Sequence, residues 1–375
     1  MSATIVKLWY RRRARLQIRL LRWFRARQRD LPWRASRDPY RIWVAEIMLQ
    51  QTRIAAVLPY YDRFLQKLPT VEALAAARQE KVLRLWSGLG YYSRARNLQR
   101  AAKEIVAQYG GRFPAKLEEA LALPGIGRYT AAAILSIAYH VPLAAVDGNV
   151  ARVLARLAAV QGDLRAPRRW QQLAQTAQHL LHKGTPGDWN QALMELGETI
   201  CTPKSPRCPA CPVSRFCRAR MLRLTREIPA ARRKSAPVSM RIAAAILRDP
   251  CGRTLLVRDP GAHDGVLFSR MWQFPAVEVR REPRVELENH LRDVLRLDSA
   301  QLQLQALPAA RHGVTFRNLT LLPFLVPVAE LPRLPRTRTL ALDRIAQLPV
   351  SSATRKIGAT AQILNSANKM VVARG

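Results

Sequence analysis

The chain has 375 residues, of which 49% are hydrophobic, so it is long enough for two domains that each bury a core. This composition excludes a disordered basic tail protein. The formal net charge of +36 at pH 7 is carried mostly by arginine and predicts a polyanionic partner. Nucleic acid is favoured over an anionic membrane surface, because the planar guanidinium suits phosphate, although a general arginine bias would explain part of the excess.

No apolar run approaches the roughly 18 residues of a membrane-spanning helix, and no signal peptide with an apolar centre opens the chain. We therefore expect a soluble cytoplasmic protein, associated with the nucleoid and without a membrane partner. Residues 1–29 hold many arginines and no acidic residue, as an organelle transit peptide can. The stretch ARLQIRLLRWFRARQRD is equally typical of a basic amphipathic helix, which is the interpretation we prefer.

Residues 1–220 are predicted to form an all-α domain. From about Tyr10 to Leu196, apolar residues recur at helical spacing, with Pro, Gly or polar breaks every ten to twenty residues. No convincing alternating strand interrupts this pattern. A cysteine cluster at 201–217 closes the domain.

The sequence changes character after this cluster. Residues 221–239 are basic, contain proline and lack clear periodicity, which is typical of a linker. Within 240–375, short runs rich in branched and aromatic residues, such as MRIAAAILRD and WQFPAVEV, are separated by Gly, Pro and Asp. With one helical segment at VELENHLRDVLRL, this region is predicted to be a smaller α+β domain.

The stretch LPGIGRYTAAAI contains a proline, two glycines and the start of an alanine-rich helix. Gly125 and Gly127 permit positive φ, so that successive backbone N–H groups can point outward at a helix N-terminus and bind phosphate oxygens. Such backbone donors hold any DNA sequence equally well. An ordinary helix–turn–helix connection is an equally good interpretation of this motif alone.

Four of the five cysteines lie close together in CTPKSPRCPACPVSRFC. Cys201, Cys208, Cys211 and Cys217 are separated by six, two and five residues, a set that can enclose a 4Fe-4S cluster. Zinc is the alternative, but zinc ribbons usually carry two CxxC pairs and this segment has one. The fifth cysteine, Cys251, is expected to be a buried small hydrophobe.

Several segments together resemble the helix-hairpin-helix DNA glycosylases of the endonuclease III superfamily, and within it the adenine DNA glycosylase (MutY) family. They are LPGIGRYTAAAI, VDGNV, AEIMLQQT, GLGYYSRARNL and the cysteine spacing, which is the most specific single element. The resemblance is strong from Leu21 to Cys217. It is weaker in RMWQFPAV and RHGVTFRNLTL, which are similar to that family's Nudix-like lesion-recognition domain.

The resemblance implies a monofunctional enzyme of base excision repair that hydrolyses the N-glycosidic bond of adenine opposite 8-oxoguanine or guanine. Lyase-competent relatives carry a lysine after the hairpin, whose amine forms a Schiff base with the sugar. This chain has Tyr129 at that position, and tyrosine cannot form a Schiff base. Base removal is therefore expected to leave an abasic site.

Two carboxyl groups in different environments suit this chemistry. The resemblance makes Glu46 the acid that protonates an imidazole-ring nitrogen of adenine, and its apolar helix would raise its pKa. It makes Asp147 the electrostatic or nucleophilic partner of the cationic sugar, and as the N-cap of a helix this carboxylate should stay ionised. Asn149 would orient the water or the carboxylate, and Tyr129 would hydrogen-bond to Asp147. A solvated surface glutamate is the alternative for Glu46.

The buried adenine must be flipped out of the duplex, and wedge side chains fill its place. The resemblance assigns this role to Gln51 and Tyr91, with core packing as the alternative for Tyr91. Arg34 is expected to contact the extruded adenine or a phosphate. The expected partner is therefore double-stranded DNA that bears the mispair. The protein is expected to be a monomer, and Gly125 and Gly127 are expected to contact the DNA backbone.

The 4Fe-4S cluster is expected to be structural, with Lys204, Arg207 and Arg215 presented to the duplex. In the second domain the family's Phe-Ser-His turn aligns with Val314, Thr315 and Phe316, so Thr315 would replace the serine while the histidine is missing. Gln273 and Ala276 also depart from the family's pattern. The clustered glutamates of a Nudix hydrolase are absent, which predicts binding rather than hydrolysis.

Two other functions remain open. One is a glycosylase for thymine or uracil opposite guanine, against which the second domain argues. The other is a non-catalytic damage-binding or redox-sensing protein that keeps the scaffold and the cluster, against which the paired acids argue.

Overall fold

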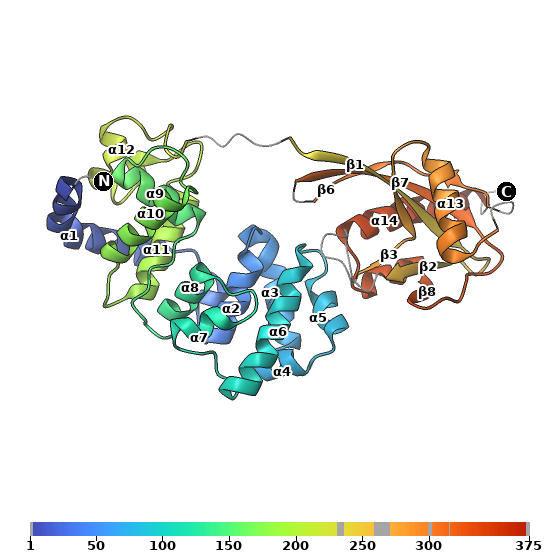
Figure 1. The fold of residues 1–375 in the computed structure, drawn as a ribbon, viewed down its shortest axis with the longest axis horizontal. Helices are drawn as coiled ribbons and strands as arrows, with labels where there is room; N and C mark the ends of the chain where they lie inside the picture. Colours follow the sequence, from blue (N-terminus) through green and yellow to red (C-terminus); the bar gives the residue numbers. More distant parts are fainter. Residues whose placement is uncertain (1–2, 231–235, 259–270, 299–301, 315, 373–375) are drawn as a thin grey trace. The chain divides into compact units, whose positions relative to one another are not determined.

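The structure is a computed structural model that describes residues 3–230, 236–258, 271–298, 302–314 and 316–372. The chain divides into two compact units (Figure 1): unit 1 is Met1–Ala77 with Arg96–Lys234, and unit 2 is Arg78–Ala95 with Ser235–Gly375. The sequence placed residues 78–95 in the helical domain. Contacts group them with unit 2, where Ser87 and Tyr92 both donate hydrogen bonds to the carbonyl of Val350.

Unit 1 is helical throughout its described residues, as predicted. Its α-helices are α1 (Ala3–Arg27), α2 (Pro39–Leu49), α3 (Ile54–Lys67), α4 (Val71–Ala76), most of α6 (Tyr92–Tyr109), α7 (Leu117–Ala122), α8 (Arg128–Ala138), α9 (Gly148–Ala158), α10 (Pro167–Leu180), α11 (Pro186–Thr199) and α12 (Arg218–Met221). Short 3-10 turns lie at Pro32–Arg34, Cys208–Ala210 and Ser214–Phe216.

Helix α9 forms the centre of the larger core of unit 1. All its residues from Val150 to Ala158 are buried, and α1, α10, α11 and α12 pack around it. The predicted basic amphipathic helix is α1, which buries Leu16, Leu20 and Phe24 and exposes the arginines between them. Because α9 begins directly after Asp147, this core fixes the position of that carboxylate.

The LPGIG segment joins α7 to α8 as a tight helical hairpin. Gly125 has φ +79°, and a Cβ there would lie 2.8 Å from the side chain of Asn97, so only glycine fits. Gly127 has φ −94° and corrects the prediction of positive φ at both glycines. It precedes α8 without any side-chain cap, and the space where a Cβ would stand is open. The first amides of α8 thus face outward at an exposed helix start.

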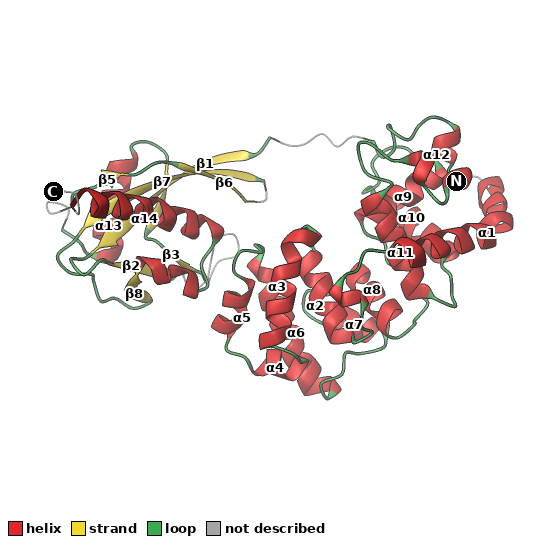
Figure 2. Ribbon diagram, turned by 180° about the vertical axis from the view of Figure 1, so that it is seen from behind, coloured by secondary structure: helices red, strands yellow, loops and turns green. Residues whose placement is uncertain are grey.

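Unit 2 is an α+β structure, as predicted (Figure 2). One sheet has the order β4-β1-β7-β5, with β6 also paired to β7, and a smaller sheet has the order β3-β2-β8. The strands are β1 (Val238–Arg248), β2 (Arg253–Arg258), β3 (Trp272–Gln273), β4 (Ala276–Val279), β5 (Gln305–Ala306), β6 (Ala310–Val314), β7 (Arg317–Pro327) and β8 (Thr337–Ala341). The helical elements are α5 (Gln79–Trp86), α13 (Pro283–Leu295), α14 (Ser352–Val372) and the 3-10 turn Leu342–Gln347.

The parallel pair β1 and β7 forms the middle of the larger sheet. Along β1, Ala244 and Ile246 pack on the side of α14, whereas Ala243, Ala245 and Leu247 pack on the side of α13. Successive side chains of a strand point to opposite faces, so the two helices cover opposite faces of this sheet. The run AAAIL in β1 is therefore apolar without alternation, because both of its faces are buried.

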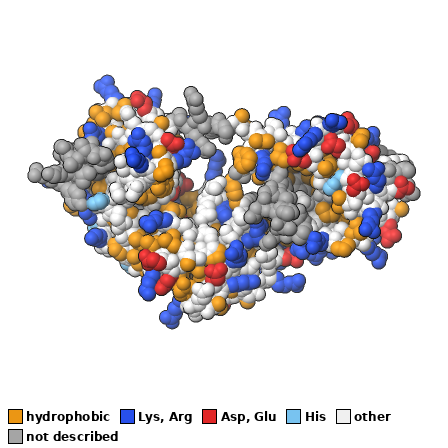
Figure 3. Space-filling model, in the orientation of Figure 1, with side chains coloured by type: hydrophobic (Ala, Val, Ile, Leu, Met, Phe, Trp, Pro, Cys, Tyr) orange, Lys and Arg blue, Asp and Glu red, His pale blue; other side chains and the backbone are white. Residues whose placement is uncertain are grey.

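Arginine and lysine side chains are scattered over the visible surface rather than collected in one patch (Figure 3). Cys251, expected to be buried, is exposed, because it lies in the turn that joins β1 to β2. Among the described residues, no helix is both long and apolar enough to cross a membrane.

Candidate active site

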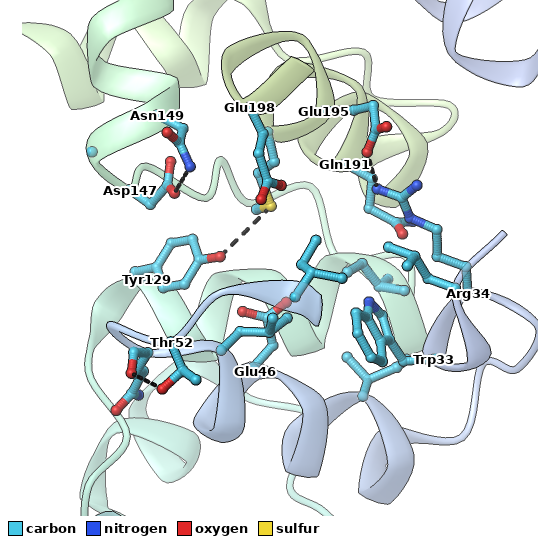
Figure 4. A pocket seen from close by; sticks show the side chains of 18 of the residues that line it. Trp33, Arg34, Glu46, Thr52, Tyr129, Asp147, Asn149, Gln191, Glu195 and Glu198 are labelled. Atoms are coloured by element: carbon cyan, nitrogen blue, oxygen red, sulfur yellow. Dashed lines mark hydrogen bonds and ion pairs between the residues drawn. The ribbon is translucent and has the colours of Figure 1, made fainter. Parts of the chain in front are cut away.

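A cavity of about 480 Å³ opens in unit 1 among α2, α8, α11 and the start of α9. It brings together four predicted residues: Glu46, Tyr129, Asp147 and Asn149. Figure 4 shows Glu46, Tyr129 and Asp147 turned toward one space from different elements. Arg34 and Gln51 also line this cavity.

Glu46 lies on α2, a helix whose other turns are buried in the core, and only 8% of the residue is exposed. Burial raises the pKa of its carboxyl from 4.5 to about 7, and the negative charge of Asp147 adds to this rise. A hydrogen bond from Tyr129 and the positive charge of Arg34 lower the pKa in part. The prediction of a carboxyl with a raised pKa is confirmed, and near neutral pH a large fraction of Glu46 carries a proton.

Tyr129 stands in the first turn of α8 beside Glu46. Its hydroxyl donates to the sulfur of Met194 at 3.6 Å and lies close enough to the Glu46 carboxyl to interact with it. The predicted hydrogen bond to Asp147 is wrong, since Asp147 acts on this hydroxyl only through its charge. Burial, with the charges of Glu46 and Asp147, raises the pKa of Tyr129 well above its ordinary value, so the phenol stays neutral and can donate.

Asp147 caps the N-terminus of α9, as predicted. Its Oδ1 accepts the backbone N–H of Val150 at 2.7 Å, and its Oδ2 accepts the amide of Asn149 at 3.2 Å. Burial nevertheless raises the pKa of Asp147 above its usual range, and these donors and the charge of Arg152 only offset part of that rise. The helix donors therefore do not lower the pKa of Asp147 below its ordinary value, because desolvation outweighs them.

A chain of hydrogen bonds leads from this carboxylate to the cysteine loop. Arg152 donates to the Asn149 side-chain oxygen and to the Gly197 carbonyl, both at 2.8 Å, and to the Cys201 carbonyl at 2.9 Å. Asn149 is therefore fixed from both sides, by Arg152 and by Asp147. The side-chain amide of Asn149 therefore points toward Asp147. This bond determines how the Asp147 carboxylate faces the cavity.

The sequence did not reveal one whole side of the cavity, which is contributed by α11. Gln191, Met194, Glu195 and Glu198 all line it, and they follow the spacing of one helix face. In the sequence, polar residues that recur on one face of an otherwise apolar helix are the pattern that could have indicated this side of the cavity. Trp33 and Thr52 were missed as well, and no pattern in the sequence marks either.

Glu195 joins the cavity to two arginines. Only 1% of its side chain is exposed, and it accepts two hydrogen bonds from Arg29, at 2.7 and 2.8 Å, and one from Arg34 at 2.7 Å. Burial alone would raise the pKa of Glu195, but these bonds more than offset it and lower the pKa. Arg34 also lies over the ring of Phe24, so it is held firmly at the cavity wall.

The four predicted cluster ligands lie in the loop after α11 and against the core around α9. Burial, together with the charges of Cys201, Cys217 and Cys208, raises the pKa of Cys211 to about 12, so the four thiols lie within electrostatic range of one another. Arg156, which is buried, donates to the Cys201 sulfur at 3.3 Å and to the Thr202 carbonyl at 2.7 Å. The described residues hold no group of three or more His, Cys, Asp or Glu side chains arranged to bind a single metal ion.

Comparison with known proteins agrees with this geometry. Residues 44–177 match the HhH-GPD superfamily base excision DNA repair protein family. An adenine DNA glycosylase from Mus musculus is 35% identical over 391 residues, an alignment that covers 90% of this chain and 76% of the mouse protein. The chain belongs to the adenine DNA glycosylase family. Its enzymes are DNA glycosylases, and residues 44–177 include Glu46, Tyr129, Asp147 and Asn149 of the cavity described above.

Other relatives agree over shorter lengths. The adenine DNA glycosylase from Homo sapiens is 50% identical over 210 residues, covering 54% of this chain and 38% of that protein. That from Arabidopsis thaliana is 38% identical over 312 residues, covering 72% of this chain and 48% of that protein. A solved thermostable thymine-DNA glycosylase superposes with a TM-score of 0.52 at 30% identity, over 57% of this chain and 98% of its own.

The two residues assigned as wedges by family resemblance share one unusual feature. Gln51 has φ +57° and Tyr91 has φ +47°, although neither is glycine. Left-handed backbone at such residues clusters at functional sites. Gln51 is exposed and lines the cavity, whereas Tyr91 is 39% exposed and belongs to unit 2.

Base release should depend on pH through both acids. With Glu46 in the role of proton donor that the family resemblance assigns to it, the rate should fall as pH rises above about 7, approaching a tenfold loss per unit. With Asp147 as the assigned charged partner, the rate should also fall as pH drops through its raised pKa. Single-turnover rates measured between acidic and alkaline pH should therefore give a bell-shaped profile. A rate that stays constant or increases above neutrality would exclude Glu46 as the proton donor.

Glu195→Gln should destabilise unit 1 by roughly 3 kcal/mol, since it leaves Arg34 and Arg29 without their buried partner. This is the low end for a broken buried pair, because 35% of the Arg29 side chain is exposed. Urea denaturation measures the loss. Asp188→Asn on the same helix is the matched control: the Arg25–Asp188 pair is 57% and 37% exposed, so that change should have little effect. Equal effects of both substitutions would contradict the importance assigned to Glu195.

Proposed function

We propose that this chain removes adenine mispaired with 8-oxoguanine or guanine, by hydrolysis and without lyase activity. The observation that carries the proposal is the pairing of two carboxyl groups in one cavity. Glu46 has a pKa near neutrality, and Asp147 is held by helix donors and Asn149. Tyr129 occupies the position where a lyase would need an amine.

The geometry supports a stepwise route. An extruded adenine in the cavity receives a proton at an imidazole-ring nitrogen from Glu46. The bond between the sugar and the base then breaks, and its electron pair leaves with the neutral base. Asp147 stabilises the positive charge that develops on the sugar, and Asn149 keeps that carboxylate in place. A water molecule adds to the sugar, its proton is lost, and an abasic site remains.

Tyr129 holds the proton donor in place in this scheme. Its neutral hydroxyl lies beside Glu46 and can donate to the carboxyl, which would fix the orientation of that group. The neighbouring charges prevent Tyr129 from ionising, so it does not compete as a base. Arg34 and Glu198 line the same cavity and would face the edges of the flipped base.

We infer that Cys201, Cys208, Cys211 and Cys217 hold a 4Fe-4S cluster. Four mutually interacting thiols from one loop suit this group, and the N–H of Arg156 at the Cys201 sulfur is typical of the donors that surround cluster thiolates. When bound, the cluster would hold the loop between α11 and α12 in one conformation. We expect about four iron and four sulfide per chain, and loss of both in Cys208→Ala. Stoichiometric zinc instead would contradict the assignment.

The preference for 8-oxoguanine rests on the hairpin between β6 and β7 in unit 2. Val314 ends β6, and Phe316 is 52% exposed with the guanidinium of Arg317 over its ring. An exposed aromatic beside a cation is suited to stack on a base of the duplex. Thr315 lies outside the described residues.

A second candidate substrate is thymine or uracil opposite guanine, which the superposition on a thymine-DNA glycosylase favours. A panel of duplexes separates the two: adenine opposite 8-oxoguanine, guanine or thymine, and thymine or uracil opposite guanine. We expect adenine release that is fastest opposite 8-oxoguanine. Release of thymine or uracil without adenine would overturn the proposal in favour of the second candidate.

A further inference from the structure

The loop between α5 and α6 has a backbone that needs support. Gly88, Gly90 and Tyr91 have φ values of +112°, +71° and +47°. Two glycines adopt such angles freely, but Tyr91 does so only when its surroundings hold it there. The conformation of this loop, and with it the direction of the Tyr91 side chain, therefore depends on its contacts.

Some of this support comes from the adjoining helices. The Trp86 indole donates to the Gly90 carbonyl at 3.1 Å, and Arg94 donates to the carbonyls of Leu89 and Gly90, both at 3.2 Å. The Arg94 guanidinium also lies 5.3 Å from the centre of the Tyr91 ring. These contacts fix the shape of the loop, but they come from residues that would move together with it.

Independent support comes from the segment around the start of α14 within unit 2. Ser87 and Tyr92, at either end of the loop, both donate to the Val350 carbonyl, at 2.8 and 2.9 Å. Arg355 donates to the Ser87 hydroxyl at 2.8 Å. Ser87 and Val350 are almost fully buried, at 2% and 0% exposed, so the hydrogen bond between them is shielded from water.

The first turns of α14 also hold the hairpin between β6 and β7. Lys356, the neighbour of Arg355, donates to the Arg311 carbonyl on β6 at 2.8 Å. The Ser351 hydroxyl caps the helix by accepting the backbone N–H of Thr354 at 3.0 Å. This cap stabilises the first turn of α14, which carries Arg355 and Lys356. One rigid helix start thus contacts both the Tyr91 loop and the strand that leads to Phe316.

We propose that the start of α14 positions Tyr91 and couples it to the β6–β7 hairpin, with Arg355 as the main positioning residue. Binding of the duplex by the hairpin would then favour the arrangement in which Tyr91 is ready to enter the base stack. The proposal rests on the proposed function for the wedge role of Tyr91. Its structural part, that Arg355 holds the loop, is independent of any activity.

The first test measures hydrogen–deuterium exchange in the free, full-length protein. Arg355→Ala should raise exchange of the backbone amides in residues 87–92 by about tenfold, and Arg355→Lys should restore part of the protection. Arg338→Ala is the matched control, because it breaks a 3.0 Å ion pair with Glu80 at the start of α5, away from the loop. Unchanged exchange in Arg355→Ala, or an equal rise in Arg338→Ala, would overturn the proposal.

The second test is a double-mutant cycle on the affinity for a duplex with adenine opposite 8-oxoguanine. Arg355→Ala should weaken binding by about tenfold in the otherwise unchanged protein and have no further effect when Tyr91 is already alanine. Additive effects would show that Arg355 does not act through Tyr91. Both tests can be read even if no adenine is released, so failure of the proposed activity and failure of this coupling are distinguishable.

Discussion

Glu46→Gln is expected to slow adenine release by about 10³-fold, the middle of the range for a lost general acid. The amide has nearly the size of the carboxylic acid and can stay buried on α2, but it cannot transfer a proton to the base. Affinity for the duplex should therefore stay within a few-fold of its original value. Single-turnover base release and equilibrium binding measure the two quantities separately.

The matched control for this substitution is Glu278→Gln, which makes the same chemical change at an exposed position on β4. It should leave the rate unchanged. If Glu46→Gln released adenine at the original rate, the proton donor would have to be a different group. If it lost affinity and rate together, Glu46 would act in binding rather than in proton transfer.

Asp147→Asn is expected to lower the rate by roughly 10²- to 10³-fold, because the developing positive charge on the sugar loses its carboxylate. Asparagine caps helices about as well as aspartate, so α9 should keep its start and the protein its stability. Asp147→Ala removes the cap as well and should cost about 1 kcal/mol of unfolding free energy. Comparison of the two variants separates the charge of this residue from its structural role.

Asp163→Asn supplies the control, since 59% of that side chain is exposed in a loop and its removal should affect neither rate nor stability. Loss of stability in Asp147→Asn equal to that in Asp147→Ala would mean that the cap, and not the charge, explains any loss of activity.

The sequence predicted much of the site through its resemblance to the family, and local patterns are consistent with two of the residues that the resemblance assigned. Asp147 could be recognised as a helix N-cap, and Glu46 as an acid on an apolar helix, since both depend on neighbours in the chain. The two structural classes followed from periodicity in the same way. The change from 3.6-residue spacing to short branched runs near Met240 marked the second region.

The parts that could not be predicted depend on contacts between distant segments. The buried network of Glu195 with Arg29 and Arg34 joins α11 to the chain about 160 residues earlier. The partners of the Tyr129 hydroxyl depend on how α8 packs against α11 and α2. Likewise, the balance that raises the pKa of Asp147 is set by burial, which no local pattern around VDGNV reveals.

The grouping of residues 78–95 with unit 2 also depends on contacts between distant segments of the chain. Their spacing is helical and continuous with the neighbouring helices, so the sequence assigns them to the first domain. Only the hydrogen bonds to Val350 and Arg355 show where they pack.

We propose that this cavity hydrolyses the bond to adenine without a covalent amine intermediate. The most direct test incubates the protein with a duplex that carries labelled adenine opposite 8-oxoguanine and develops the reaction with and without alkali. We expect free adenine in both samples and strand scission only after alkali. Scission without alkali would contradict it, because a lysine would then have to act as the nucleophile that Tyr129 cannot be.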